Sequence, residues 1–366
     1  MNIVLSVILF ILVIGLLIFI HELGHFLVAK RNGIGVVEFS IGMGPLLHSW
    51  TSKGTRFSLR WLPFGGYCML LGSETYFDDE ADETVSDDAH AYKNKPVWQR
   101  IAVTVAGPLF NFILAFLLGV LLTAMIGAQT SDLGTVYADY PAGRAGLQAG
   151  DRIVRLGNEN IHLFKEISLY ISLHQGEVLD VTYERDGVRH TTQLTPEYDE
   201  EYGSWLIGIG SAARLSNMSF PQILQYGAYE FGYGVSAVFK SLGLMVTGRA
   251  SINDLSGPVG IAGQVNTIVS EVQKDTEGES IFVTAFWILV NMINFAIIIS
   301  ANLGVLNLLP VPGLDGGKLL LLVIEAIRGK PLNKKVEGIV MIVGIVLLLG
   351  LMAVVLVNDI RKVFFV

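Results

Sequence analysis

Charged residues are scarce in this chain of 366 residues, because Asp, Glu, Lys and Arg together make up only 16% of it. Soluble domains carry about 25% charged residues, so a wholly soluble protein is disfavoured. Basic residues are fewer than acidic ones, 25 against 33, and the net charge of −8 argues against a nucleic-acid-binding protein. A single cysteine, Cys68, excludes an internal disulfide bond. Hydrophobic residues make up 52% of the chain, which predicts a membrane protein that also has a soluble domain.

Four apolar stretches meet the requirement of roughly 20 residues for crossing a bilayer. They are Met1–Ile20, Ile101–Ile126, Ser280–Leu309 and Gly338–Val357. A cleaved signal peptide is the alternative for the first stretch, but it lacks a basic beginning and a small-residue cleavage site before Lys30. A fifth long stretch, Gln225–Gly248, contains Glu230 and Lys240, and we interpret it as an amphipathic or surface-lying helix.

Lys and Arg are concentrated in the segments that join the first span to the second and the third span to the fourth. Such residues favour the cytoplasmic side of a membrane, so both segments are predicted to be cytoplasmic. The N-terminus, the C-terminus and the long middle region, about Gln129–Thr276, are then expected on the other side.

The first cytoplasmic segment is rich in aromatic and apolar residues, and its glycines and prolines predict short strands with turns over residues 36–72. We expect this β-rich loop to contact the membrane. Within it, the region of Gly65, Gly66 and Tyr67 could hold an unwound substrate as an added strand, since glycines let a second backbone approach closely. A plain turn at the two glycines is the alternative. The acidic stretch Glu74–Asp88 is interpreted as a solvated loop.

The composition becomes that of a soluble domain after the second span. The run Ala145-Gly146-Leu147, followed by Gly150-Asp151, resembles a PDZ domain of the type found in bacterial proteases. Such domains bind an extended peptide by adding it as a strand to a sheet edge. The Gly-Asp pair as a mere turn is the alternative. We predict one PDZ domain, about 129–210, with a helix over Leu163–Leu173 and a hairpin turn at Asp186-Gly187.

His21, Glu22 and His25 follow the first apolar stretch directly. Residues i and i+4 of a helix lie one above the other, so the two imidazoles could bind one zinc ion. Glu22 lies beside them, where a carboxylate can take a proton from water. An ionisable cluster that continues a membrane span is costly and is therefore a candidate functional site. The alternative is a pair of surface histidines just beyond the span.

Zinc sites in enzymes use three protein ligands, and Asp315 is the candidate for the third. It is the only acidic residue between Ser280 and Ile324, and prolines and glycines interrupt the helix around it. With four spans, His21 and Asp315 both lie on the cytoplasmic side. A further span at Gln225–Gly248 would place them on opposite sides, so the four-span topology and a shared site support each other.

Together these residues resemble the site-2 protease family of intramembrane zinc metalloproteases, in its bacterial RseP-type (regulator of sigma-E protease) branch. His21–His25 matches the HExxH motif of the family, and Asn307–Gly316 matches NxxPxPxLDG. Further matches are Gly42–Pro45, Pro63–Tyr67, Ala106–Asn111 and Leu255–Gly260. The resemblance covers nearly the whole chain, but the single PDZ domain differs from members that carry two.

The resemblance implies His21, His25 and Asp315 as ligands of one catalytic Zn²⁺ ion and Glu22 as the general base. It also implies that Asn111 and Asn307 are polar groups near the bound peptide. Hydrogen bonds that pack helices together are the alternative role for these two asparagines.

We therefore predict a polytopic α-helical membrane protein with four transmembrane helices, a membrane-associated β-rich loop and an inserted extracytoplasmic PDZ domain of the α+β class. The N-terminal membrane region is expected over residues 1–128, with the first span at about 1–28, the β loop at about 36–72 and the second span at about 101–126. The PDZ domain follows over residues 129–210, and an extracytoplasmic linker with an amphipathic helix over residues 211–279. The C-terminal membrane region covers residues 280–366, with the third span at about 280–309 and the fourth at about 338–357.

The expected function is an intramembrane zinc metalloprotease of the inner (cytoplasmic) membrane, with its active site toward the cytoplasm. Its expected partners are membrane lipid, transmembrane substrates such as single-span anti-sigma factors or signal peptides, and a peptide or substrate tail at the PDZ domain. A non-catalytic PDZ-bearing membrane scaffold and a metal transporter are the alternatives. The presence of Glu22 disfavours the scaffold, and the lack of repeated halves disfavours the transporter.

Overall fold

The computed structural model describes residues 2–73, 88–251 and 255–364. The acidic stretch predicted as a solvated loop therefore lies outside the described residues, except for Asp88. The chain forms two compact units, residues 1–115 together with 238–366, and residues 116–237.

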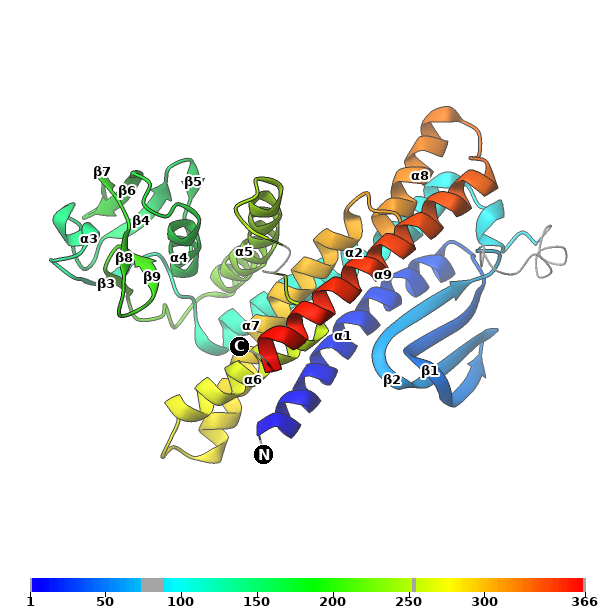
Figure 1. The fold of residues 1–366 in the computed structure, drawn as a ribbon, viewed down its shortest axis with the longest axis horizontal. Coiled ribbons are helices and arrows are strands. Elements are labelled where there is room, and N and C mark those ends of the chain that lie inside the picture. The colour runs from blue at the N-terminus through cyan, green and yellow to red at the C-terminus, as the bar shows by residue number, and fades with distance from the viewer. Residues whose placement is uncertain (1, 74–87, 252–254, 365–366) are drawn as a thin grey trace. The chain divides into compact units, whose positions relative to one another are not determined.

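Four helices among the described residues are long and apolar enough to cross a membrane, as predicted (Figure 1). They are α1 (Asn2–Arg31), α2 (Val97–Ile126), α7 (Ile281–Leu308) and α9 (Lys334–Phe364). A helix satisfies its own backbone hydrogen bonds, which lipid requires. In α1 the first charged side chain is that of Glu22, so the preceding five turns are wholly uncharged.

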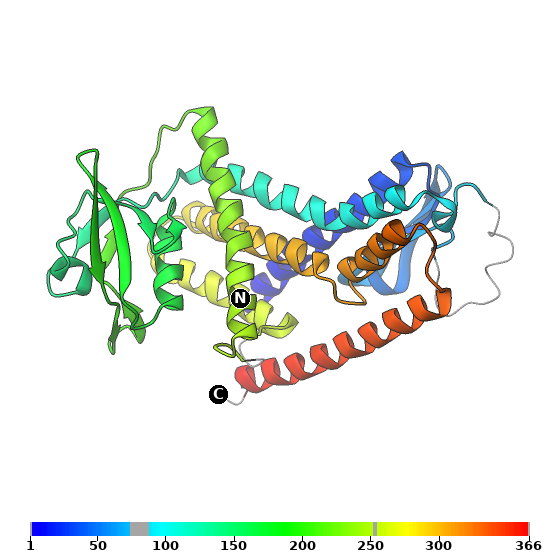
Figure 2. The same cartoon turned by 90° about the horizontal axis from the view of Figure 1, so that it is seen from above.

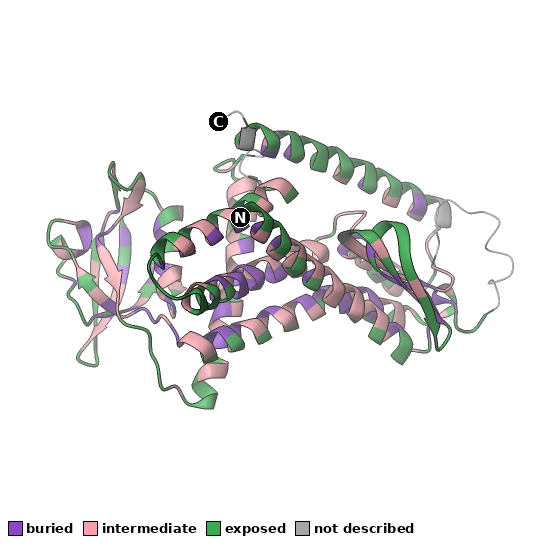
Figure 3. Cartoon of the chain, turned by 90° about the horizontal axis from the view of Figure 1, so that it is seen from below, coloured by how far each residue is buried: buried purple, intermediate pink, exposed green. Residues whose placement is uncertain are grey.

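The first unit contains a short bundle built on α1. Helix α6 (Pro258–Asp275) packs against α1 and α7, and its buried residues Val265, Val269 and Val272 form one helical stripe. This helix lies within the segment predicted as a linker. Helix α9 contacts α6, where Asp359 accepts hydrogen bonds from the amides of Gly257 and Gly260. The rest of α9 is mostly exposed (Figure 3), as expected of a helix that faces lipid.

The predicted β-rich loop is a hairpin that lies beside α1 (Figure 1). Its strands β1 (Val36–Ser52) and β2 (Thr55–Leu70) are antiparallel and joined by a tight turn at Lys53-Gly54, where both φ angles are positive. The prediction of short strands is wrong, because the glycine-rich segment after Ile41 shifts the register and does not end the strand. The short helix η1 (Tyr92–Asn94) follows the hairpin.

The interpretation of Gly65 and Gly66 as a plain turn is also wrong. Both glycines lie inside β2, where Gly66 pairs with Ile41 and Tyr67 pairs with Ser40. Cross-strand hydrogen bonding therefore holds this segment of the chain extended.

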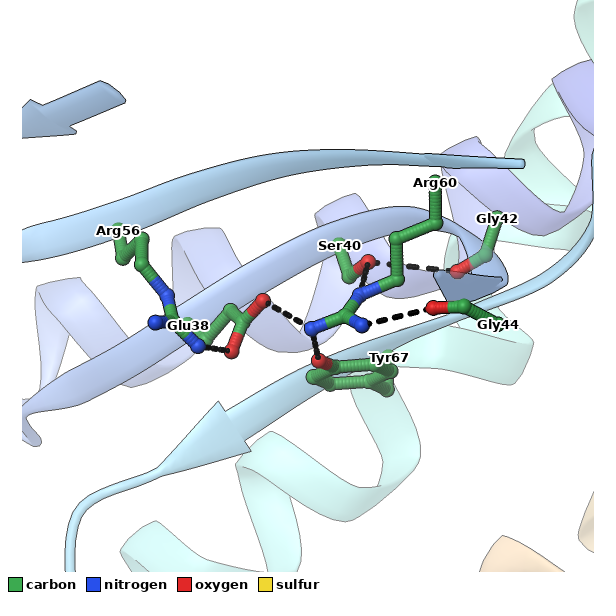
Figure 4. A network of polar contacts seen from close by, with 7 residues as sticks. All are labelled: Glu38, Ser40, Gly42, Gly44, Arg56, Arg60 and Tyr67. Carbon is green, nitrogen blue, oxygen red and sulfur yellow. Dashed lines mark hydrogen bonds and ion pairs between the residues drawn. The ribbon is translucent and has the colours of Figure 1, made fainter. Parts of the chain in front are cut away.

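A polar network centred on Glu38 joins the two strands (Figure 4). The Glu38 side chain is only 2% exposed and forms ion pairs with Arg56 and Arg60. Arg60 also donates hydrogen bonds to the Tyr67 hydroxyl at 2.8 Å and the Gly44 carbonyl at 2.9 Å. Burial alone raises the pKa of Glu38, but the surrounding hydrogen-bond donors outweigh it and lower the pKa to about 2. Glu38 is therefore ionised at neutral pH.

The second unit contains the predicted β-rich, PDZ-like domain. Strands β4 (Arg152–Leu156), β5 (Glu159–Asn160), β6 (Leu179–Arg185) and β7 (Val188–Leu194) form an antiparallel sheet in the order β5-β4-β6-β7. The smaller elements are β3 (Leu133–Val136) paired with β10 (Ile209–Ser211), β8 (Glu197–Asp199) paired with β9 (Ser204–Leu206), and helices α3 (Pro141–Arg144) and α4 (Phe164–Leu173). The predicted helix at Leu163–Leu173 and the hairpin at Asp186-Gly187 are confirmed.

Asp151 is more than the turn residue of the alternative interpretation. Its side chain is 1% exposed and accepts hydrogen bonds from Arg185 at 2.6 and 2.8 Å and from the Gln148 amide at 2.8 Å. The Gly-Asp pattern thus supplies a buried ion pair that joins the start of β4 to β6.

Helix α5 (Phe220–Val246) occupies the stretch that was interpreted as an amphipathic helix, and it is not one of the four candidate spans among the described residues. Its Glu230 forms an ion pair with Lys165 of α4, and the ring of Tyr229 stacks on His162 at 4.0 Å. The PDZ-like domain is therefore attached to α5 by polar and aromatic contacts.

We expect replacement of Glu38 to destabilise the protein in a pH-dependent way. A carboxyl with a lowered folded-state pKa stabilises fully above its unfolded pKa of about 4.3, and this stabilisation is lost as the pH falls toward 2. Glu38→Gln should therefore lower the apparent Tm in detergent at pH 7, by the equivalent of about 1.5–3 kcal/mol for charged hydrogen bonds, and by less at pH 3.

Glu197→Gln is the matched control, because Glu197 pairs with Arg144 while 59% exposed and should matter little. An equal loss of Tm for Glu38→Gln at both pH values would contradict the ionised network.

Candidate metal centre

Three side chains that could bind a metal ion, those of His21, His25 and Asp315, converge at one point. Their candidate ligand atoms all lie within 4.8 Å of one another. Asp315 Oδ2 lies 3.0 Å from His21 Nε2 and 3.4 Å from His25 Nε2, and the two Nε2 atoms are 3.2 Å apart. The histidine side chains are 12% and 13% exposed, so the alternative of surface histidines beyond the span is wrong.

One face of α1 and the break between α7 and α8 create this convergence. α1 continues through His21 and His25, which lie one turn apart on the same face. α7 ends at Leu308, and Pro310 and Pro312 cannot supply the amide hydrogens that a continuing helix needs. A new helix, α8 (Asp315–Arg328), begins at Asp315 itself, where a carboxylate interacts favourably with the helix dipole. The predicted interruption of the helix around Asp315 is confirmed.

Helix α8 lies beside the beginning of α2 (Figure 2), and one contact joins it to α2 and another to the preceding helix η1. The Arg100 guanidinium binds both carboxylate oxygens of Glu325, and both side chains are largely buried. The Lys318 ammonium lies 4.4 Å from the centre of the Tyr92 ring. The helix that carries Asp315 therefore has a defined position close to the two histidines.

A glycine on α2 leaves the space in which an ion could lie. A Cβ atom on Gly107 would lie 2.3 Å from His25 Nε2 and 2.7 Å from His21 Nε2, which no real Cβ tolerates. Any larger residue at this position would push into both candidate ligand atoms.

The protonation of His25 fits a bound cation. His25 Nδ1 lies 2.7 Å from the carbonyl oxygen of Val103, a contact in which only a protonated Nδ1 can donate. In the neutral ring Nε2 then carries a lone pair, and this lone pair faces the buried Asp315 Oδ2, for which no hydrogen-bond partner is found among the described residues. Two acceptors that face each other without a proton fit a zinc ion between them.

Glu22 lies where β2 crosses α1. Its carboxylate lies close to the backbone amide of Cys68. A Cβ on Gly66 would lie 3.5 Å from Glu22 Cγ and 2.8 Å from the carbonyl oxygen of Ser40, so the strand packs directly on the helix at this point. The hairpin therefore holds the side chain that is the candidate base.

The remaining predicted site residues occupy different surroundings. Asn111 is fully buried on α2, and its Nδ2 lies 3.2 Å from His21 Nδ1. Asn307 is partly buried in the last turn of α7. Gly65 lies against Met43 in the hairpin, and the Tyr67 hydroxyl belongs to the Glu38 network (Figure 4).

Three contributions were missed by sequence reasoning: the Val103 carbonyl, the Cys68 amide and the space at Gly107. The first two are backbone atoms, which every residue type carries, so no side-chain pattern could reveal them. Gly107 lies in the Ala106–Asn111 segment that matched the family, which was the one available signal.

Comparison with known proteins identifies the family of the chain. The family model for peptidase family M50 matches residues 9–351. A protein of Clostridium acetobutylicum is 36% identical, over 97% of both chains. Zinc metalloprotease RasP of Bacillus licheniformis is 31% identical and Regulator of sigma-W protease RasP of Bacillus subtilis 30% identical, each over 98% of this chain and 99% of the relative. The chain therefore belongs to peptidase family M50, which confirms the resemblance to the site-2 proteases.

Solved PDZ domains of SdrC-like proteins from Listeria monocytogenes and Listeria innocua match 23% and 24% of the chain at 21% identity. Their TM-scores are 0.21 and 0.22. The description of the soluble domain as PDZ-like therefore rests on the Gly-Asp pattern and on the observed sheet and helix.

We expect Gly107→Ala to weaken zinc binding, because the added methyl group occupies the space beside both Nε2 atoms. The loss should reach about 10–100-fold in affinity, as for other changes next to metal ligands. Competition with a chromophoric chelator on the purified protein measures it. Gly15→Ala on α1 is the control, since no atom lies within 4 Å of its added Cβ. Equal zinc affinity for both variants would show that the ion binds elsewhere.

Proposed function

We propose that the protein is an intramembrane zinc metalloprotease in which His21, His25 and Asp315 hold one zinc ion. The observation that supports this most is the convergence of two imidazoles and a carboxylate from distant segments of the chain, with their candidate ligand atoms within 4.8 Å of one another. Membership of a peptidase family and the names of the two RasP relatives point to the same metal and the same class of reaction.

Glu22 is the proposed general base. A bound zinc ion would supply Lewis acidity, which lowers the pKa of water toward about 7 and polarises the scissile carbonyl. The Glu22 carboxylate accepts the proton of the attacking water and returns it to the leaving amine. The carboxylate lies beside β2, close to the Cys68 amide.

The substrates proposed here are peptide bonds within or near transmembrane segments. The site lies in the C-terminal half of the candidate span α1, and a helical substrate hides its peptide bonds until it is unwound. The stretch Gly65, Gly66 and Tyr67 of β2 is the proposed acceptor of the unwound segment as an added strand, with Asn307 as a polar group near the peptide. The name of the Bacillus subtilis relative, a regulator of sigma-W protease, favours single-span anti-sigma factors, and signal peptides are a second class.

The PDZ-like domain is proposed to bind a peptide or a substrate tail. A cavity of about 530 Å³ lies between α4 and the segment that runs from β9 to β10. Its walls are aromatic and aliphatic, including Phe164, Ile167, Ile171 and Trp205, with polar groups such as the Tyr140 side chain among them. A predominantly apolar wall with a few polar groups suits an extended peptide.

Two variants should separate the role of the base from that of the ligand. Glu22→Gln should retain zinc and lower the cleavage rate of a membrane-spanning substrate by about 10²–10⁴-fold. Asp315→Ala should lose both activity and zinc affinity, the latter by at least about tenfold. Zinc content and cleavage are measured on the same preparations in detergent. Normal turnover by Glu22→Gln would end the proposed mechanism, and unchanged zinc content in Asp315→Ala would make another residue the third ligand.

We further propose that residues 129–217 lie outside the cytoplasm and that the hairpin lies inside. In a Cys68→Ala background, a cysteine at the exposed position Glu201 should react with an impermeant thiol reagent in whole cells. A cysteine at Ser52, exposed at the end of β1, should react only after lysis and is the matched control. The reverse pattern would overturn the orientation derived from Lys and Arg.

A further inference from the structure

One stripe of α2 faces both histidines. Val103, Gly107 and Asn111 follow one another at intervals of four residues, so they lie on the same side of the helix. The Val103 carbonyl contacts His25 Nδ1, Gly107 lies beside both Nε2 atoms, and Asn111 contacts His21 Nδ1. Each imidazole thus meets α2 through its Nδ1 atom and leaves Nε2 toward Asp315.

We propose that Asn111 is a positioning residue that sets the tautomer of His21. Its amide oxygen accepts a hydrogen bond from His21 Nδ1–H, so that the Nε2 lone pair is directed at the metal. The proposal rests on the zinc site proposed above, and it gives Asn111 a role other than contact with the peptide.

The contact between the side chains of Asn111 and His21 has two possible versions. In one version the amide nitrogen Nδ2 faces the ring, and in the other the amide oxygen Oδ1 does. With Nδ2 at 3.2 Å from His21 Nδ1, the amide donates and the ring proton lies on Nε2, which then cannot bind a metal. In this version Asn111 Oδ1 is buried and no hydrogen-bond partner is found for it among the described residues. Rotation of the amide by 180° exchanges the two atoms within nearly the same shape.

A bound metal ion would stabilise the version in which the amide oxygen faces the ring. His21 Nε2 lies 3.2 Å from His25 Nε2 and 3.0 Å from Asp315 Oδ2, so it belongs to the cluster that would bind the ion. A ligand imidazole must keep its proton on the other nitrogen, and a hydrogen-bond acceptor on that nitrogen stabilises this tautomer. The Val103 carbonyl has this role for His25, and the Asn111 oxygen has it for His21.

The position of Asn111 is fixed by its own neighbours. The hydroxyl of Ser300 on α7 donates a hydrogen bond of 2.7 Å to the backbone carbonyl of Asn111. Both residues are fully buried. The turn of α2 that carries the amide is therefore tied to the helix that leads to Asp315, and the side chain is not free to follow a substrate.

The test compares three side chains at position 111 by zinc affinity alone, in competition with a chromophoric chelator on purified protein. Asn111→Leu keeps the approximate shape but offers no acceptor, and it should bind zinc about 10–100-fold more weakly. Asn111→Asp keeps an oxygen acceptor and should restore most of the affinity. Thr123→Val, a buried position further along the same helix, should leave the affinity unchanged.

Equal affinity for the leucine variant and the unsubstituted protein would overturn the proposal, and so would an aspartate variant as weak as the leucine variant. A raised KM with unchanged zinc affinity would also overturn it, in favour of contact with the peptide. If Asn111→Leu does not fold, Asn111→Ala against Asn111→Asp makes the same comparison. Failure of the unsubstituted protein to bind zinc would instead refute the proposed function.

Discussion

One electrostatic constraint links the helices: three candidate ligand atoms lie within 3.0–3.4 Å of one another in a largely buried place. Without a proton or a cation between them such atoms repel one another, and away from water their charge and polarity are costly. A divalent cation between the three atoms would attract each of them and so remove the repulsion. The face of α1 that carries the histidines, the break after α7 and the start of α8 all meet at this point, as the proposed zinc site requires.

Two different neighbours of α1, helix α2 and strand β2, contact the histidines and Glu22. Helix α2 contacts His25 through the Val103 carbonyl and leaves space beside both histidines at Gly107. It approaches α1 so closely that a Cβ on Gly24 would lie 2.4 Å from the Ala106 carbonyl oxygen. Strand β2 instead packs against Glu22, the proposed base, at Gly66 and close to the Cys68 amide. In the proposed mechanism, substitutions on the two elements would therefore disturb metal binding and proton transfer separately.

Charges far from the metal set the position of α8. The Arg100–Glu325 ion pair is largely buried, and such a pair contributes less to stability than to a unique arrangement, because any other packing would leave a buried charge unpaired. In the hairpin, the Glu38 network joins the two strands in the same way. Both elements that flank the candidate metal centre thus contain buried ion pairs.

The amino-acid sequence by itself determined the properties that depend on neighbours along the chain. Length and hydropathy predicted the four spans, the interval of four predicted that His21 and His25 share a face, and Asp186-Gly187 predicted a hairpin turn. Family motifs added Asp315, which no local rule connects to α1.

Only the tertiary structure decided the surroundings of these side chains. The contact of Asn111 with His21, the carbonyl of Val103 and the amide of Cys68 depend on which helix face or strand lies next to α1. Helix α6 was not predicted within the linker, because its short apolar stripe indicates a packed helix only once α1 and α7 are known to lie beside it. Backbone atoms and missing Cβ atoms leave little trace in a sequence, because their effect comes from distances in space between segments far apart along the chain.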